Sequence, residues 1–172
     1  MTPPERLLID AFLGQEISAD ELLRRFPVNL AQQPAYVVQL LTMAYQQQSA
    51  DDVDYTLMIS HLAPGAPAGL TAILVELLLA DWHYMHENLV HWLQALRDPA
   101  SVEPLYHAAL RFAEVGGQET DGLPVQCTWA LGDIGTESAK AKLVLLARSR
   151  NLPLREAAAY QLQRLTKQER QD

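Results

Sequence analysis

The sequence predicts an all-α fold, an α-solenoid of antiparallel helix pairs, with about ten helices in 172 residues. Three observations lead to this expectation. Apolar residues recur three or four positions apart along most of the chain, as they do on one face of an α-helix. No run of β-branched and aromatic residues alternates with polar ones over more than a few positions, so no strand is expected. A unit of about 31 residues also recurs in the C-terminal half.

Four helices are expected in the N-terminal third of the chain. Pro3 and Pro4 suit a first helical turn, and the apolar stripe that follows them stops at Gly14. Ser18, with Glu21 three residues later, forms a capping-box pattern that opens a short helix. The expected helices run from Pro3 to Gly14, from Asp20 to Phe26, from Pro34 to Gln48, and from Asp51 to the Pro64-Gly65 break.

Six further helices follow, and most of the breaks between them are only a few residues long. Such short connections make successive helices antiparallel neighbours. The exception is the polar, glycine-rich segment 116–122, which we interpret as a surface loop inserted into one repeat. The expected helices are Pro67 to Ala80, Trp82 to Leu96, Ser101 to Val115, Pro124 to Ile134, Glu137 to Ser149 and Leu154 to Thr166.

Length and composition favour a single domain, 1–172, with capping helices over 1–63 and repeats over 64–172. The longest apolar stretch, Leu70 to Ala80, has 11 residues including Glu76, whereas a membrane-spanning helix needs roughly twenty. The N-terminus has no secretory-signal pattern, and Cys127 is the only cysteine. We therefore expect a cytoplasmic protein without disulfides, in which Cys127 is a core residue.

The formal net charge of −8 is distributed unevenly along the chain. Residues 1–122 carry a net charge of −11 and residues 123–172 a net charge of +3. The acidic part repels phosphate backbones, so no nucleic-acid partner is expected. An acidic field attracts a basic protein partner, although the same acidity can serve solubility alone.

Self-similarity is the most informative feature of the sequence. Pairs at an offset of 31 are Leu131 with Leu162, Ile134 with Leu165, Trp129 with Tyr160 and Cys127 with Ala158. Pairs at an offset of 38 are Leu93 with Leu131, Leu96 with Ile134 and Leu105 with Leu143. The seven extra residues match the length of segment 116–122. One helix-pair unit is therefore repeated, with an insertion in one copy.

The segment from Val125 to Leu143, which contains Ala-Leu-Gly-Asp-Ile-Gly at 130–135, together with Leu154 to Leu162, resembles the short HEAT-like repeat of bacterial proteins. The match is good over 125–165 and fair over 88–113, but Gln126 stands where the family has arginine. The resemblance implies a right-handed solenoid with a concave binding surface. HEAT-like repeats also occur in phycobilin lyases and DNA glycosylases, so the fold alone does not fix the function.

The densest cluster of functional side chains lies in the segment 81–92. If 82–96 is one helix, His83, Glu87 and His91 share a face at i, i+4 and i+8. Their order differs from the His-Glu-x-x-His of zinc proteases, and we expect no metal and no cofactor. The simpler interpretation is a core face of Trp82, Met85, Leu89, Trp92 and Leu96, opposite an exposed protein-contact patch.

No nucleophile, base and orienting group can be assigned, so the chain is not expected to be an enzyme. The segments 82–87, 96–106 and 127–134 resemble small bacterial HEAT-repeat proteins associated with polymorphic toxin systems. That resemblance implies an immunity protein that neutralises a basic toxin domain by binding it. The alternatives are a general protein-interaction adaptor and a phycobilin lyase-like enzyme. The expected contact residues are Asp51, Asp52, Asp54, His83, His86, Glu87, His91, Glu114, Glu119 and Asp121.

Overall fold

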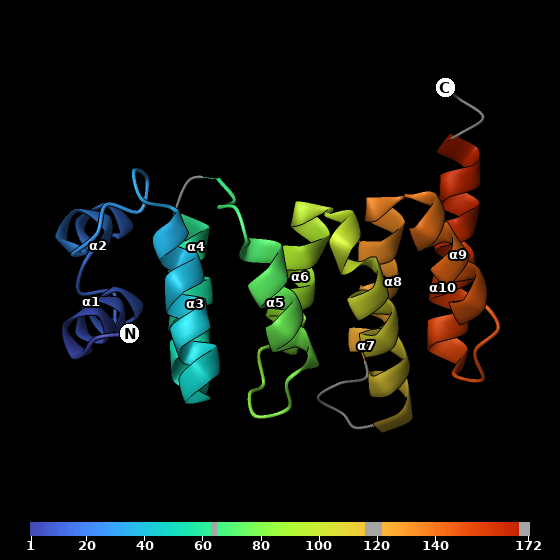
Figure 1. Cartoon of the computed structure of the whole chain (residues 1–172), viewed down its shortest axis with the longest axis horizontal. Helices are drawn as coiled ribbons and strands as arrows, with labels where there is room; N and C mark the ends of the chain where they lie inside the picture. The colour runs from blue at the N-terminus through green and yellow to red at the C-terminus, as the bar shows by residue number, and fades with distance from the viewer. Residues whose placement is uncertain (63–64, 116–121, 169–172) are drawn as a thin grey trace. The chain divides into compact units, whose positions relative to one another are not determined.

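The structure, a computed structural model, describes residues 1–62, 65–115 and 122–168 of the chain. Within these residues it contains ten α-helices, one 3-10 turn and no β-strand (Figure 1). This confirms the all-helical prediction. The elements are α1 (Pro3–Leu13), α2 (Ala19–Arg25), α3 (Ala35–Gln47), α4 (Ala50–Leu62), α5 (Leu70–Leu79), α6 (His86–Leu96), η1 (Pro99–Ser101), α7 (Val102–Val115), α8 (Leu123–Ile134), α9 (Glu137–Leu146) and α10 (Leu152–Gln168).

The chain divides into two compact units. Unit 1 comprises Met1–Ile73 and Asp81–Met85, and unit 2 comprises Leu74–Ala80 and His86–Asp172. Helices α1 to α4 therefore belong to unit 1 and α6 to α10 to unit 2, while α5 contributes residues to both. The single domain, with capping helices over 1–63 and repeats over 64–172, stays a prediction.

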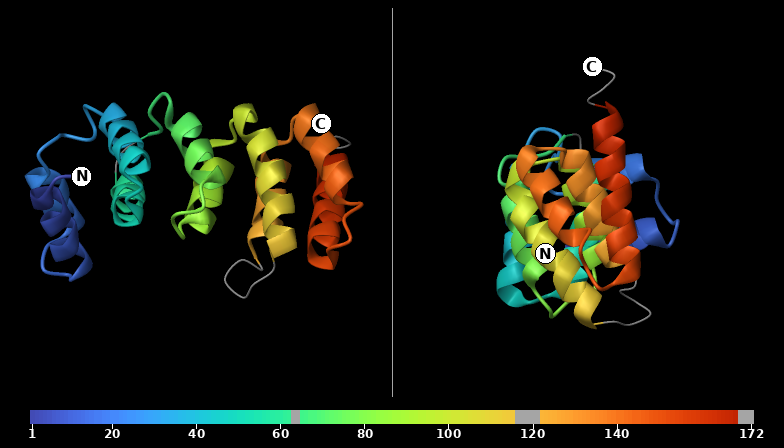
Figure 2. Two further views of the ribbon diagram at one scale, coloured as in Figure 1. Left: turned by 60° about the horizontal axis from the view of Figure 1, so that its bottom comes forward. Right: turned by 90° about the vertical axis from the view of Figure 1, so that its right-hand side faces the viewer.

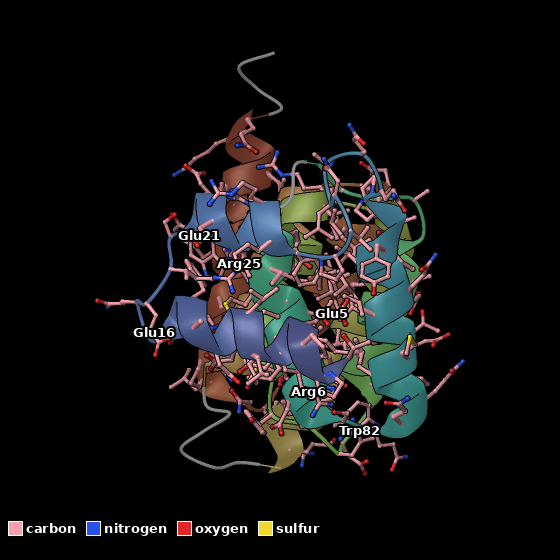
Figure 3. The ribbon with its side chains drawn as sticks, turned by 90° about the vertical axis from the view of Figure 1, so that its left-hand side faces the viewer. Glu5, Arg6, Glu16, Glu21, Arg25 and Trp82 are labelled. Atoms are coloured by element: carbon pink, nitrogen blue, oxygen red, sulfur yellow. The ribbon has the colours of Figure 1, made fainter. Side chains whose placement is uncertain are left out.

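In unit 1, α1 packs against α2 and α4, and α3 packs against α4. Figure 3 looks onto α1, which carries Glu5 and Arg6, and onto α2, where Glu21 and Arg25 form an ion pair at 3.4 Å. The fully buried side chains of this core include Ile9, Leu22, Leu40, Leu41 and Ile59. Each of them comes from a helix whose apolar stripe the sequence indicates.

In unit 2, α8 is the central helix. It packs against α6, α7, α9 and α10, and α9 also packs against α7 and α10 (Figure 2). The contacts therefore form two rows, one of α6, α8 and α10 and one of α7 and α9. Leucines fill the space between the rows, and the fully buried ones include Leu89, Leu93, Leu105, Leu131 and Leu143.

Local signals end several helices where the sequence indicates. The Ser18 hydroxyl accepts the backbone N–H of Glu21 at 3.2 Å and so begins α2. Gly135, with φ +65°, caps α8 and donates its N–H to the Leu131 carbonyl. The Thr136 hydroxyl then accepts the N–H of Ala139 at 3.2 Å and begins α9. A left-handed glycine followed at once by a capping threonine produces the tight reversal between α8 and α9.

The largest difference from the predicted elements lies before α6, which begins at His86 and not at Trp82. The His83 Nδ1 accepts the backbone N–H of Met85 at 3.2 Å, which satisfies that group outside a helix. The ring of Trp82 lies 6.2 Å from that of Tyr45 and 4.9 Å from that of His83. Tertiary packing within unit 1 therefore overrides the helical spacing of residues 82–85.

Candidate protein-contact surface

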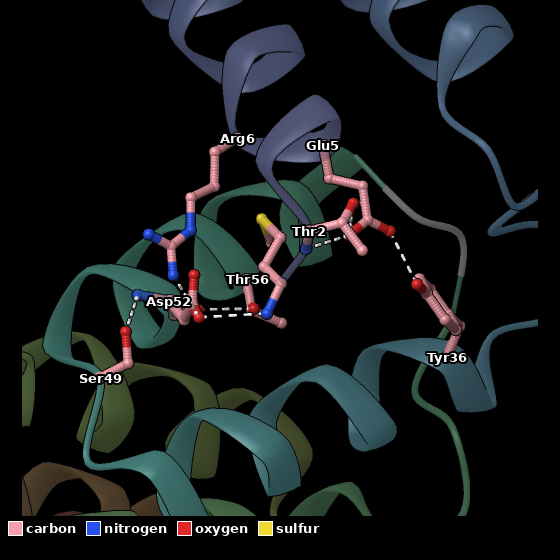
Figure 4. Close-up of polar contacts among 8 residues, drawn as sticks. Thr2, Glu5, Arg6, Tyr36, Ser49, Asp52 and Thr56 are labelled. Carbon is pink, nitrogen blue, oxygen red and sulfur yellow. Dashed lines mark hydrogen bonds and ion pairs between the residues drawn. The ribbon is translucent and has the colours of Figure 1, made fainter.

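Asp52, which was predicted to belong to an acidic contact patch, does not reach the surface. It is 0% exposed, and its Oδ2 accepts hydrogen bonds from Arg6 Nη2 at 2.8 Å and from the Met1 ammonium at 3.1 Å (Figure 4). Burial acts to raise the pKa of Asp52, but the hydrogen bonds from Arg6 and the ammonium group outweigh burial and lower it. The carboxylate of Asp52 is thus buried and paired within unit 1, whereas the prediction placed it on an accessible contact surface.

Glu5 forms a second buried carboxylate cluster in unit 1. Its Oε2 accepts the backbone N–H and the hydroxyl of Thr2, both at 2.7 Å, and its Oε1 accepts the Tyr36 hydroxyl at 2.7 Å (Figure 4). Burial acts to raise the pKa of Glu5, but the bonds from Tyr36 and Thr2 leave it lowered. Burial and the bond to Glu5 raise the pKa of Tyr36 to about 12. The hydrogen bond from Tyr36 to Glu5 joins α3 to α1, and the bond from Arg6 to Asp52 joins α1 to α4.

The other predicted acidic contacts are scattered along the chain. Asp51 is exposed in the first turn of α4, and Asp54 is half-buried. Burial and then the charge of Asp51 raise the pKa of Asp54. Glu114 is exposed near the end of α7, whereas Glu119 and Asp121 lie outside the described residues. Asp51 and Glu114 thus keep exposed carboxylates.

The predicted histidine face is divided by the start of α6. His83 is buried in unit 1, so the prediction that it is an exposed contact residue is wrong. His86 is half-buried, with its Nε2 2.8 Å from the Ala80 carbonyl and its ring edge-on to Phe112 at 4.9 Å. Glu87 and His91 are exposed on α6, as predicted. The i, i+4, i+8 line through His83 does not form, because His83 precedes the helix.

Helices α8 and α10 expose an aromatic pair at positions that the repeat aligns. Trp129 is 39% exposed and Tyr160 is 54% exposed, and their ring centroids are 5.5 Å apart at an interplanar angle of 42°. The guanidinium of Arg164, one turn after Tyr160, lies 5.8 Å from the centre of the Trp129 ring. Arg164 Nη2 also donates to Asp133 Oδ1 at 2.6 Å. Tryptophan, tyrosine and arginine are the residue types most enriched at the energetic centres of protein interfaces.

The same face continues onto α6. His91 corresponds to Trp129 at the offset of 38, and His91, Glu87 and Gln126 line a pocket of about 310 Å³ between α6 and α8. Trp129 follows Gln126 by three residues and lies on the same side of α8. We call the exposed side chains Glu87, His91, Trp129 and Tyr160 the ring face.

Three further observations concern the described residues. Cys127 is fully buried in α8, and burial raises the pKa of its thiol to about 12, which keeps the thiol protonated. Among the residues that the structure describes, no group of three or more His, Cys, Asp or Glu side chains is placed to hold a metal ion. A search of these same residues for a helix long and apolar enough to span a membrane also finds none.

Sequence reasoning aligned Trp129 with Tyr160 but assigned neither residue to a contact surface. The missing information was which side of α8 faces outward, and the neighbouring helices decide that.

Comparisons of the chain with protein-family models, with curated proteins and with solved structures find no match. The proposed function therefore rests on the geometry of the chain itself.

Proposed function

We propose that this chain is a non-catalytic protein-binding module whose contact surface is the ring face. The exposed Trp129–Tyr160 pair is the observation that carries the proposal. Each ring is held in place by the other, so a partner that covers the pair gains apolar burial with little loss of side-chain entropy. The polar side chains Glu87 and His91 continue the same surface and supply a rim able to form hydrogen bonds.

The helix packing of unit 2 supports the further proposal that the chain contains HEAT-like repeats and forms an α-solenoid. Its helices contact one another in two rows, as consecutive helix pairs do in repeat proteins. The ring contact between Trp129 and Tyr160 and the ion pair between Asp133 and Arg164 both join residues 31 positions apart. Repeat proteins commonly use the surface formed by equivalent positions to bind other proteins.

The more specific form of the proposal is an immunity-type protein that binds a bacterial toxin domain and covers its active site. The resemblance of the segments 82–87, 96–106 and 127–134 to small proteins of toxin systems and the acidity of residues 1–122 support this form. A basic toxin domain would be attracted by exposed carboxylates such as Asp51, Glu87 and Glu114. Such a protein acts in the cytoplasm and needs no cofactor.

The alternatives are a general adaptor with several weaker partners and a repeat-fold enzyme of the phycobilin lyase type. An adaptor uses the same surface but leaves its partners exchangeable. For the enzyme, Cys127 is a poor nucleophile, because its thiol is buried and protonated. We therefore place the enzyme after both binding functions.

The proposal is tested by capture of partners from the native lysate with the tagged full chain, in low and in moderate salt, followed by mass spectrometry. The Trp129→Ser/Tyr160→Ser variant should lose the partner, because truncating interface aromatics costs about 2 kcal/mol or more. Tyr84→Ser is the matched control, since Tyr84 is 66% exposed in unit 1. One stoichiometric, basic partner that survives moderate salt supports immunity, and several salt-labile partners support an adaptor. Equal capture by both variants contradicts the proposed surface.

A further inference from the structure

A second pocket in unit 2 lies at the ends of α8 and α10 and has a volume of about 320 Å³. Its charged lining residues are Arg97, Asp133, Lys140 and Arg164, three cations and one carboxylate. They come from four segments: the residue after α6, the end of α8, α9 and α10. We call these four side chains the basic pocket. Its lining is net positive, although Lys140 Nζ also pairs with Glu137 Oε1 at 2.7 Å.

The single carboxylate of the basic pocket is fully engaged within the protein. Asp133 Oδ1 accepts from Arg164 Nη2 at 2.6 Å, and Oδ2 accepts from Gln94 Nε2 at 2.6 Å. Burial acts to raise the pKa of Asp133, but hydrogen bonds from Gln94 and Arg164 and the charge of Arg97 lower it. Asp133 therefore stays ionised and fixes the guanidinium of Arg164 in place.

Two buried side chains beside the basic pocket have polar atoms without a hydrogen-bond partner among the described residues. Gln161 is 0% exposed, and among the described residues neither its Nε2 nor its Oε1 has a hydrogen-bond partner. Arg164 Nε is buried and equally without one. Gln161 Oε1 lies directly against Gly132, which lines the pocket, because a Cβ at Gly132 would clash with it. Buried polar groups normally have partners, and the unpartnered Arg164 Nε–H belongs to a guanidinium that lines the basic pocket, which favours an anionic group there.

We propose that the basic pocket binds a carboxylate from an acidic side chain of the protein that docks on the ring face. This inference rests on the proposed function, since the ring face brings the partner to the pocket. The two sites share a residue, because Arg164 lines the pocket and also covers the ring of Trp129. A planar carboxylate matches the fork of an arginine guanidinium, as Asp133 does from within the chain.

The inference is tested on the full chain with small probes, without the partner protein. The probes are an end-blocked tetraglutamate peptide, the corresponding tetraglutamine peptide and inorganic phosphate. Binding is followed by NMR of the arginine Nε–Hε groups at moderate salt, where non-specific attraction is screened. The tetraglutamate peptide should shift the signals of Arg97 and Arg164 to saturation, and the tetraglutamine peptide should leave them unchanged.

The Arg97→Gln/Lys140→Gln variant should weaken tetraglutamate binding by about tenfold or more. The matched control is Arg148→Gln/Arg150→Gln, which removes the same charge from exposed positions outside the pocket and should weaken binding by less than about twofold. Equal weakening in both variants would overturn the inference, since it would indicate attraction by net charge alone. Saturable binding of phosphate without binding of tetraglutamate would also overturn it.

The test distinguishes this inference from the proposed function. If the partner is lost on substitution of Trp129 and Tyr160 but tetraglutamate does not bind, the ring face stands and the carboxylate site fails. If tetraglutamate binds at the basic pocket while capture of every partner is indifferent to Trp129 and Tyr160, the carboxylate site stands and the ring face fails.

Discussion

The two units differ in where they place their charged side chains. Unit 1 buries Glu5 and Asp52 and pairs them with Tyr36, Arg6 and the chain's own ammonium group. Among the described residues of unit 2, no charged side chain is fully buried. Its charged and aromatic groups instead lie on the ring face and in the basic pocket. The comparison teaches that the strong acidity of a segment does not identify which carboxylates a partner can reach.

The largest expected effect is the loss of the buried ion pair in unit 1. Asp52→Ala should lower the free energy of unfolding by about 2–4 kcal/mol, because it leaves an ammonium group unpaired in the interior. The loss should fall toward the lower end of that range, since the Arg6 side chain is 40% exposed and can regain water. Urea denaturation followed by circular dichroism measures the change.

Asp51→Ala is the matched control for that prediction, because Asp51 precedes Asp52 and is exposed. Its effect on the free energy of unfolding should stay within about 0.5 kcal/mol. Equal effects of the two substitutions would contradict the distinction between a structural and an accessible acidic residue.

The next largest effect is expected where α10 approaches α8. In Gly132→Ala the new Cβ would clash with the ends of the buried Gln161 side chain and the partly exposed Arg164 side chain, so both must move. We expect a net loss of about 1–2 kcal/mol, even though alanine favours a helix by about 1 kcal/mol. Thermal and urea unfolding of the variant measure this loss.

Gly122→Ala serves as the control for Gly132→Ala, because the nearest atoms of the described residues to its new Cβ are 4.0 Å away. Its free energy of unfolding should fall by less than about 1 kcal/mol, because alanine is less favourable than glycine at the N-cap of α8 but no described side chain has to move. A Gly132→Ala variant as stable as this control would show that α8 and α10 are less closely packed than described.

Acidification should act on unit 1 through Glu5 and Asp52. Both have folded-state pKa values below their ordinary values of 4.5 and 3.8. Their contribution to stability is therefore present above those values and is lost as the pH falls through the folded pKa. The urea midpoint should change little between about pH 7 and pH 5 and then fall. Glu5→Gln should flatten the fall, because the amide does not titrate, although its single oxygen replaces only one of the two Glu5 oxygens that accept hydrogen bonds.

The smallest effect is expected for a surface pair of unit 2. Glu103 lies 2.6 Å from Lys142 Nζ, but the Glu103 side chain is largely exposed. Glu103→Gln should change the free energy of unfolding by less than about 0.5 kcal/mol, and less still in high salt. A double-mutant cycle measures the coupling free energy between Glu103 and Lys142. A coupling above about 1 kcal/mol would mean that this exposed pair stabilises unit 2 as strongly as a buried pair stabilises unit 1.

The helices were predictable because their signals are local. Glycine and proline breaks, the Ser18 cap and the spacing of apolar residues each act within a few positions, and α1 to α4 begin and end within a few residues of the prediction. The repeat offset of 31 also aligned Trp129 with Tyr160, which are in contact. Applied to charged residues, the same offset would have paired Asp133 with Arg164.

The burial of Asp52 and His83 was not predictable from such signals. The hydrogen bond from Arg6 to Asp52 joins residues 46 positions apart, and the bond from Tyr36 to Glu5 joins residues 31 apart outside any repeat. Helical spacing also suggested one helix over 82–96, whereas the side chains of Trp82 and His83 pack in unit 1. Contacts with residues distant in sequence determine whether Asp52 and His83 are buried, and local sequence patterns do not reveal these contacts.

Photo-crosslinking at one position in each unit tests the central claim most directly. Tyr160 in unit 2 and Tyr84 in unit 1 are both exposed tyrosines, and each is replaced in turn by benzoylphenylalanine in the full chain. Irradiation in the native cell should join one protein to position 160 in high yield and none to position 84. Crosslinking at position 84 alone, or equally at both positions, would contradict the assignment of the ring face as the contact surface.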